Sequence, residues 1–188
     1  MTQAEIIAKV RSILNEHGSD DVLSIADDRV LLDDYITEAI PDAVAMLAVK
    51  GFRVNVAAFT SIDSDGAITL PNDFLSLLSL KLSTWKRAVT SVGIMGSPEY
   101  IMAQNEFTQP GPNSPYCYRD GSVLRCMPKG ELNAQASEYN AKYSGVINAD
   151  SKEGTAVCYM TAALVLGVFG DNVGKQSLSD ICFNLLQG

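Results

Sequence analysis

Apolar side chains follow a helical period twice in the first 50 residues of this 188-residue chain. The first stretch, residues 6–14, predicts a short amphipathic helix that ends before Gly18. The second, residues 31–48, predicts a longer helix that ends at Gly51. Polar residues dominate between the two helices, so residues 19–29 are expected to form a loop.

Three residues of the longer helix predict details of its shape. Asp33 and Asp34 are expected in its first turn, where carboxylates offset the positive end of the helix dipole. Pro41 lies inside the pattern and predicts a kink near the middle, because proline lacks the amide donor and clashes with the preceding turn.

Two further helices are predicted near the C-terminus, over about residues 153–169 and 175–186, with Gly170 and Gly174 between them. The first of these is apolar nearly all round and rich in small residues. It fits a central core helix, and it also fits a helix that a neighbouring subunit approaches closely. Its apolar run, residues 156–169, is shorter than the roughly 20 residues that cross a membrane.

The period changes from helical to alternating at about residue 66. Ser97 and Pro98 then predict the start of a short helix that runs to about Asn105, with serine as the N-cap. The prolines of residues 106–115 predict a loop with restricted backbone freedom. Four strands are predicted over residues 68–70, 78–83, 86–92 and 137–143.

A β-hairpin is predicted around Asp120-Gly121, because this pair suits the positive φ that a type I′ turn needs at both central positions. In that register Cys117 faces Leu124, and Cys126 lies on the same face of the hairpin. Both cysteines are therefore expected to be packed thiols.

The order of elements is helices, then strands with one short helix, then helices. This segregation predicts an α+β fold in which the N- and C-terminal helices, residues 1–51 and 152–188, form a helical bundle. An antiparallel β subdomain of about residues 66–145 is inserted between them. The length of the chain fits one domain with such an insert.

The net charge of −8 is unevenly placed, since residues 1–50 hold ten acidic and four basic residues. An acidic surface disfavours tight nucleic-acid binding, which needs lysine and arginine at the phosphates. Such a surface is typical of a solvated helix face. It would also suit the lining of a passage through which DNA slides without sticking.

The four cysteines are far apart in the sequence, and none forms a C-x-x-C pair, which argues against a zinc site and a disulfide scaffold. The N-terminus lacks a basic region followed by an apolar run, so no secretory signal is expected. We therefore expect the chain to be made in a reducing cytoplasm.

Three motifs resemble sites of chemistry but lack a required residue. His17, the only histidine, has no nucleophile motif beside it. Residues 170–177 resemble a phosphate-binding loop with one residue too few between the glycines, so a helix–helix turn is expected. Residues 61–68 resemble the start of a calcium loop, but its last ligand position holds Asn72, so a turn is expected. We predict no catalytic residue, no cofactor, no metal site and no enzyme activity.

An ordered set of short motifs resembles a known family. Residues 66–74 read Gly-Ala-Ile-Thr-Leu-Pro-Asn-Asp-Phe, and Trp85, a Ser-Pro-Glu-Tyr segment at 97–100 and Gln104 follow them. This order of elements resembles the head-to-tail connector (adaptor, or ring) proteins of short-tailed phages, and particularly those of crAss-like phages. The resemblance covers roughly residues 5–185.

The resemblance implies a structural subunit of the virion, at the junction of head and tail. Such proteins assemble, usually as twelve copies, into a ring that docks on the portal protein and carries further connector or tail proteins. DNA then passes through the channel of the ring without specific binding. Family members often contact the portal through the C-terminal helical segment, here about residues 171–188.

Seven residues are predicted to contact other subunits in such an assembly. A loop with few accessible conformers limits the ordering cost of association, so the proline-rich loop is expected to contact a neighbour or an adjoining ring. An inert surface loop is the alternative. The candidates from this loop and from the C-terminal segment are Phe107, Gln109, Pro110, Pro112, Lys175, Leu178 and Phe183.

Two other functions compete with the connector hypothesis. One is a small cytoplasmic adaptor or ligand-binding α+β module that is unrelated to virions. The other is an enzyme, which would need a polar pocket with converging ionisable groups. The single histidine makes such a pocket hard to build.

Overall fold

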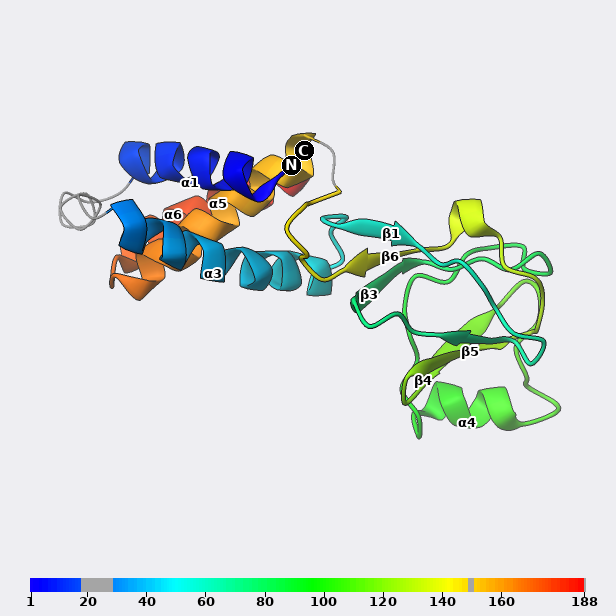
Figure 1. The fold of residues 1–188 in the computed structure, drawn as a ribbon. Helices are drawn as coiled ribbons and strands as arrows, with labels where there is room; N and C mark the ends of the chain where they lie inside the picture. Colours follow the sequence, from blue (N-terminus) through cyan, green and yellow to red (C-terminus); the bar gives the residue numbers. More distant parts are fainter. Residues whose placement is uncertain (18–28, 149–150, 188) are drawn as a thin grey trace. The chain divides into compact units, whose positions relative to one another are not determined.

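A computed structural model describes residues 1–17, 29–148 and 151–187 of the chain (Figure 1). It forms two compact units. The helical unit comprises Met1–Asn55 and Lys142–Gly188, and the β unit comprises Val56–Ala141. The described residues form five α-helices and two antiparallel three-stranded sheets, which confirms the predicted α+β fold. Apart from Arg29, which begins a helix, the predicted loop of residues 19–29 lies outside the described residues.

Three of the four long helices of the helical unit pack around the fourth, α5 (Figure 1). This helix contacts α1, α3 and α6, and its small residues Ala156, Ala162 and Ala163 are fully buried. The interpretation of this segment as a core helix is therefore confirmed. The bounds are α1 Gln3–His17, α3 Arg29–Val49, α5 Ser151–Val168 and α6 Asn172–Gln187.

The helix α1 begins with a reciprocal pair of capping hydrogen bonds. The Glu5 amide donates to Thr2 Oγ1 over 3.4 Å, and the Thr2 amide donates to Glu5 Oε2 over 2.8 Å. Hydrogen bonds from the Thr2 backbone and side chain lower the pKa of Glu5. This capping box satisfies two amides at the start of the helix that lack an intrahelical partner. The apolar residues Ile6, Val10 and Leu14 then occupy one buried face.

The helix α3 begins earlier than the sequence pattern indicates. Because it starts at Arg29, Asp33 and Asp34 lie in its second turn, and the prediction that they occupy the first turn is wrong. Asp33 instead accepts a hydrogen bond from Arg11 Nε of α1 over 2.7 Å. Pro41 lies inside the helix with its side chain exposed, and the helix continues to Val49.

The turn between α5 and α6 has the geometry of two helix caps. Gly170 has a φ of +84°, its amide donates to the Gly167 carbonyl, and the Asp171 amide donates to the Leu166 carbonyl, as in a Schellman motif. The Gly174 amide then donates to Asp171 Oδ1 over 2.8 Å and caps α6. The predicted helix–helix turn is confirmed, but Gly174 belongs to α6 rather than to the turn.

The β unit contains two small sheets around one core. One sheet has the strand order β1-β6-β3 and the other has the order β2-β5-β4. The core holds Phe59, Leu80, Trp85 and Leu124, and Phe59 packs against Tyr139 with ring centroids 4.8 Å apart. The bounds are β1 Val56–Ala58, β2 Ala67–Thr69, β3 Phe74–Ser79, β4 Tyr116–Asp120, β5 Val123–Met127 and β6 Glu138–Ala141.

The Leu-Pro-x-Asp-Phe segment of residues 70–74 connects the two sheets. Phe74 donates its amide to the Pro71 carbonyl over 3.0 Å, which closes a turn between β2 and β3. The Phe74 ring packs against Tyr139 of β6 at 5.7 Å, and the Tyr139 hydroxyl donates to Asp73 Oδ1 over 3.1 Å. Burial, together with Asp73, raises the pKa of Tyr139. The motif therefore has a structural role at the corner between the sheets.

Two of the predicted strands differ from the structure. The strand predicted over 78–83 begins at Phe74 and ends at Ser79, after which Leu80 forms only an isolated bridge with Val89. The strand predicted over 86–92 is wrong, because its backbone bonds go to different partners: the Lys86 amide donates to the Pro112 carbonyl, and Val89 pairs with Leu80. The strand over 68–70 is confirmed as β2, shifted by one residue, and the strand over 137–143 is confirmed as the shorter β6.

The predicted hairpin is present, but its register is shifted. Asp120 pairs with Val123, so the two loop residues are Gly121 and Ser122, and Cys117 lies opposite Cys126 rather than Leu124. Gly121 has a φ of +60°, and no described residue other than glycine has a positive φ. This pattern fits a type II′ turn, which places glycine at the first central position.

The short helix α4, Pro98–Gln104, begins as the sequence predicts. Ser97 is its N-cap, and its side chain accepts a hydrogen bond from the Tyr100 amide over 3.2 Å. The Tyr100 ring meets the Tyr118 ring of β4 edge to face at 4.9 Å. This aromatic contact places α4 against the hairpin.

Asn55 stabilises the place where the chain leaves the helical unit and returns to it. Its side-chain Nδ2 donates to the Lys142 carbonyl over 3.0 Å, and its Oδ1 accepts from the Asn148 amide over 3.0 Å. The residue is 4% exposed. One buried amide therefore joins the outgoing and the returning segments within the helical unit.

Candidate functional site

The β unit exposes five large apolar side chains within one short segment. Ile94, Met95, Ile101, Met102 and Phe107 are between 50% and 88% exposed, and all flank or belong to α4. We call them the 94–107 surface. Single exposed apolar residues are ordinary in proteins, but a concentration of them is typical of a surface that contacts another molecule.

Phe107 is presented by an ordered turn. Its amide donates to Asn105 Oδ1 over 2.9 Å, and Thr108 Oγ1 donates to the Met102 carbonyl over 2.7 Å. Gln109 Nε2 donates to the Glu106 carbonyl in the same turn. The phenyl ring is 88% exposed, so the local hydrogen bonds hold an apolar side chain in water.

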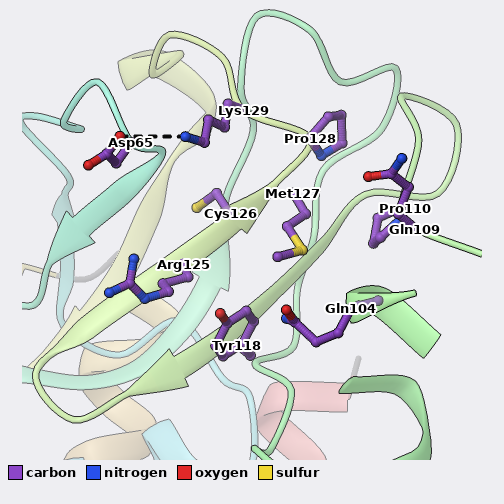
Figure 2. Close-up of a pocket in the computed structure, with 11 residues that line it drawn as sticks. Asp65, Gln104, Gln109, Pro110, Tyr118, Arg125, Cys126, Met127, Pro128 and Lys129 are labelled. Carbon is purple, nitrogen blue, oxygen red and sulfur yellow. Dashed lines mark ion pairs between the residues drawn. The ribbon is translucent and has the colours of Figure 1, made fainter. Parts of the chain in front are cut away.

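A pocket of about 520 Å³ lies beside this turn, on the β unit (Figure 2). The strand β5 and the residues after it supply Arg125 and Lys129, while the loop after α4 supplies Gln109 and Pro110. Figure 2 shows Gln104 reaching from α4 toward Tyr118 of β4. The structure thus brings two of the predicted contact residues, Gln109 and Pro110, to one rim.

Both cationic side chains of the pocket are paired with carboxylates. Arg125 Nε lies 3.0 Å from Asp120 Oδ2, and this hydrogen bond raises the pKa of Arg125. Lys129 Nζ lies 3.5 Å from Asp65 Oδ1, the pair marked in Figure 2. These groups are solvent exposed, so each pair contributes little to stability. An anion would have to displace a carboxylate to bind here.

The thiols of the β unit are packed core groups. Cys117 and Cys126 are 0% and 3% exposed, and burial raises the pKa of each to about 12. Their thiolates are therefore scarce at neutral pH, and both are poor nucleophiles. The prediction that they are packed thiols is confirmed.

His17 lies exposed at the end of α1, in the other unit.

The turn predicted in place of a calcium loop is present. Asp63 Oδ1 accepts hydrogen bonds from the amides of Asp65 and Ala67, over 3.0 Å and 2.7 Å, and so orders the approach to β2. Across the described ranges no cluster of three or more His, Cys, Asp or Glu is placed to hold a metal ion. No described helix is long and apolar enough to cross a membrane.

The three candidate residues of α6 differ in their accessibility. Lys175 is exposed. Phe183 is half-buried; its ring lies 6.3 Å from that of Phe52, and Lys50 Nζ lies 4.3 Å from its centroid. Leu178 is fully buried in the helical unit, so its side chain is not accessible to another subunit. We therefore retain Lys175 and Phe183 as candidates and treat Leu178 as a core residue.

A groove of about 360 Å³ runs between α3 and α5 near the start of α6. Leu164 and Val168 of α5 contribute apolar surface, and Glu38 and Asp42 of α3 contribute two carboxylates. The side chain of Lys175 reaches it from α6 and lies over Gly167, where a Cβ atom would meet Lys175 Cδ at 2.9 Å. We call this the α3–α5 groove.

Sequence reasoning missed both Ile94-Met95 and the α3–α5 groove. Ile94 and Met95 come directly after a segment predicted to be a strand. Apolar residues next to a strand are expected to be buried with it, so nothing indicated that these two are exposed. The groove depends on how two helices pack, which their separate periods do not specify. The acids of α3 at one-turn spacing, Glu38 and Asp42, were the available signal.

Comparison with known proteins identifies a family that the chain matches. The model of the SU10 adaptor protein family matches residues 1–163. This range includes α1, α3, the whole β unit and most of α5, whereas α6 follows it. A search of curated proteins found no match. The family match agrees with the connector resemblance drawn from the sequence.

Proposed function

The chain belongs to the SU10 adaptor protein family, and on that premise we propose that it forms a ring that docks on a phage portal and joins head to tail. The family supports a structural adaptor role in the virion, in contact with other head or tail proteins. The proposal adds a ring of twelve copies, the portal as partner and DNA passing through the channel. It also adds the crAss-like type.

The observation that carries the proposal beyond the family is the 94–107 surface. Local hydrogen bonds hold Phe107 at 88% exposure, and an apolar side chain presented in this way is typical of a surface that contacts another subunit. Burying its phenyl ring against another subunit would contribute roughly 2 kcal/mol or more. Pro110 and Pro112 stiffen the same loop, which lowers the entropic cost of that contact.

The helical unit has charges that suit a channel lining. Its two segments, Met1–Asn55 and Lys142–Gly188, hold fourteen acidic and eight basic residues, while the β unit holds eight and six. A net charge of −6 in one unit repels the DNA phosphates, so DNA near that unit would move without sticking. We propose that the helical unit contributes acidic surface to the passage.

We assign the portal contact to the exposed face of α6. Gln176, Asp180 and Asn184 are exposed and lie one helical turn apart, so they share one face. Removing the whole helix would be a poor test, because Leu178 and Cys182 belong to the core and their loss would destabilise the helical unit. Surface substitutions test the contact without this complication.

The test is electron microscopy of the purified full chain mixed with the portal protein of the same phage. We expect a ring of the chain stacked on the portal. The double variant Asp180→Arg, Asn184→Arg is expected to abolish docking. The matched control Asn15→Arg, Glu16→Arg changes two exposed residues of α1 and is expected to dock normally. Portal particles without a stacked ring in the unaltered sample would overturn the proposed function. Normal docking of the α6 variant would overturn the assignment to α6.

A further inference from the structure

The α3–α5 groove combines an apolar floor with an acidic rim. Val168, which is 64% exposed, and the half-buried Leu164 offer aliphatic surface. Glu38 and Asp42 stand one helical turn apart on α3, and Lys175 is the cationic side chain that lines the same groove. A complementary occupant would bring aliphatic side chains and a positive charge.

The β unit presents a surface of that composition. Ile94 and Met95 are 76% and 50% exposed, and they lie in one region of the surface with Arg119 and Gly121 of the β4–β5 hairpin. We call Ile94, Met95 and Arg119 the hairpin-side knob. Arg119 is exposed, and its Nε donates to the Gly121 carbonyl over 2.9 Å, which fixes the side chain at the hairpin tip.

The knob is held firmly to its unit. The Gly93 amide donates to the Cys117 carbonyl over 2.8 Å, and the Arg119 amide donates to the Gly93 carbonyl over 3.3 Å. The Ser97 amide donates to the Ile94 carbonyl over 3.2 Å, which closes a turn around the two apolar residues. A preformed surface loses little conformational entropy when it binds.

We propose that the hairpin-side knob of one copy of this chain occupies the α3–α5 groove of the next copy. Ile94 and Met95 cover the aliphatic floor, and Arg119 faces the carboxylates of Glu38 and Asp42. The two surfaces lie on different units of the same chain, so the contact is head-to-tail and is repeated from copy to copy, as a ring requires. The inference rests on the proposed function and names the subunit contact that it leaves open.

Charge favours this pairing over a contact between like units. Two helical units would bring surfaces of net charge −6 against each other, whereas knob and groove bring a guanidinium to two carboxylates. Complementary charges steer association and disfavour wrong partners. Lys175 reduces the negative charge of the groove without cancelling it.

Disulfide cross-linking tests the contact in the full chain. The four native cysteines are buried, so an introduced surface cysteine reacts selectively. We expect the double variant Ile94→Cys, Val168→Cys to give an oxidised ladder of dimers, trimers and higher species when it is assembled on the portal. The matched control is the double variant Ile94→Cys, Val49→Cys. Val49 is 75% exposed on the helical unit and lies outside the groove. The ladder is expected to exceed that of the control by at least about fivefold, because contact raises the effective concentration of the two thiols.

The charges are tested separately by a swap. Arg119→Glu is expected to weaken assembly roughly five- to tenfold, and adding Glu38→Arg is expected to restore most of it. A ladder no stronger than the control, or a cross-link confined to the monomer, would overturn the knob–groove contact even if electron microscopy shows rings on the portal. Rings seen without the ladder would leave the proposed function standing, and the absence of both would overturn the two together.

Discussion

The helical unit and the β unit are stabilised in different ways. The long helices have 15 to 21 residues each, and their backbone hydrogen bonds are satisfied within the helix. The strands have three to six residues and pair with segments far away in the sequence, as when Val56 of β1 pairs with Asn140 of β6. The helical unit therefore depends on the packing of whole faces, while the β unit depends on many separate long-range contacts.

The difference places the tolerance to change in different parts of the molecule. In the β unit single bonds connect distant segments, such as the one from Trp85 Nε1 to the Pro128 carbonyl at 2.7 Å. In the helical unit α5 is covered by three helices, so its contribution is shared among many side chains. We expect substitutions in one unit to leave the stability of the other nearly unchanged, since distant sites contribute additively.

The largest expected effect comes from truncating one core residue in each unit. Ile36→Ala in α3 and Leu124→Ala in β5 each remove a fully buried side chain and are expected to cost about 2–5 kcal/mol. Trp85 is the only tryptophan and lies in the β unit, so its fluorescence reports that unit alone. Urea unfolding should show a fluorescence shift for Leu124→Ala and a shift in helical circular dichroism for Ile36→Ala. Equal shifts in both signals for both variants would show that the units unfold as one.

Gly93→Ala is expected to destabilise the β unit by about 1–3 kcal/mol, because overpacking forces side chains to move. A Cβ atom at this position would clash with Tyr116 Oη, a hydroxyl that is buried. Gly111→Ala in the same unit has no atom within 4 Å of the new methyl group and serves as the control. The urea midpoint of the Trp85 fluorescence measures both variants, and equal midpoints would contradict the close contact.

Alkaline pH is expected to destabilise both units. Burial raises the pKa of Cys117 and Cys126 to about 12, and that of Cys158 and Cys182 to about 11, against an ordinary value of 9.0. The folded state keeps these protons while the unfolded state loses them, so the stability is full below pH 9.0 and falls as the pH rises toward the folded values. The loss is on the order of 1 kcal/mol for each thiol between pH 9 and 10.

The comparison of urea midpoints at pH 8 and pH 10 checks this expectation. Replacing both cysteines of one unit by alanine should remove most of the pH dependence of that unit and leave that of the other unit unchanged. Tyr139 and Tyr143, whose pKa values burial also raises, account for the remainder. A pH dependence that persists unchanged in the variant would assign the effect to other groups.

The smallest expected effect is local to α1. Thr2→Ala removes the side-chain half of the capping box and is expected to cost about 1 kcal/mol in the helical unit. Thr2→Ser keeps the hydroxyl and should unfold like the unaltered chain. Circular dichroism during urea unfolding is the measurement, and the Trp85 signal should not change in either variant.

The helices were predictable because their information is local. Gly18, Gly51 and Gly170 mark the ends of apolar stripes, and each stripe becomes a buried face. In α6 the helical period places Leu178 inside, because it lies four residues before Cys182 on the same face. The prediction of Leu178 as a contact residue conflicts with this period.

The β unit was only partly predictable because strand pairing is set by distant residues. The strand β1 is three residues long and carries no alternating pattern, so it was missed. The hairpin was found from Asp120-Gly121, but one positive φ at Gly121 instead of two shifts the register. Residues 86–92 alternate like a strand, yet among the described residues only Val89 of this segment forms a bridge, with Leu80.

Asn55 gives the chain the organisation of a scaffold with an exchangeable cassette. One buried amide hydrogen-bonds both the departing and the returning segments, so the two points where the insert joins the helical unit are held at a fixed spacing. A different insert whose two ends match that spacing could replace residues 56–141 without altering the helical unit. Such an exchange would have to keep Asn55, because its amide makes both hydrogen bonds that join the two segments.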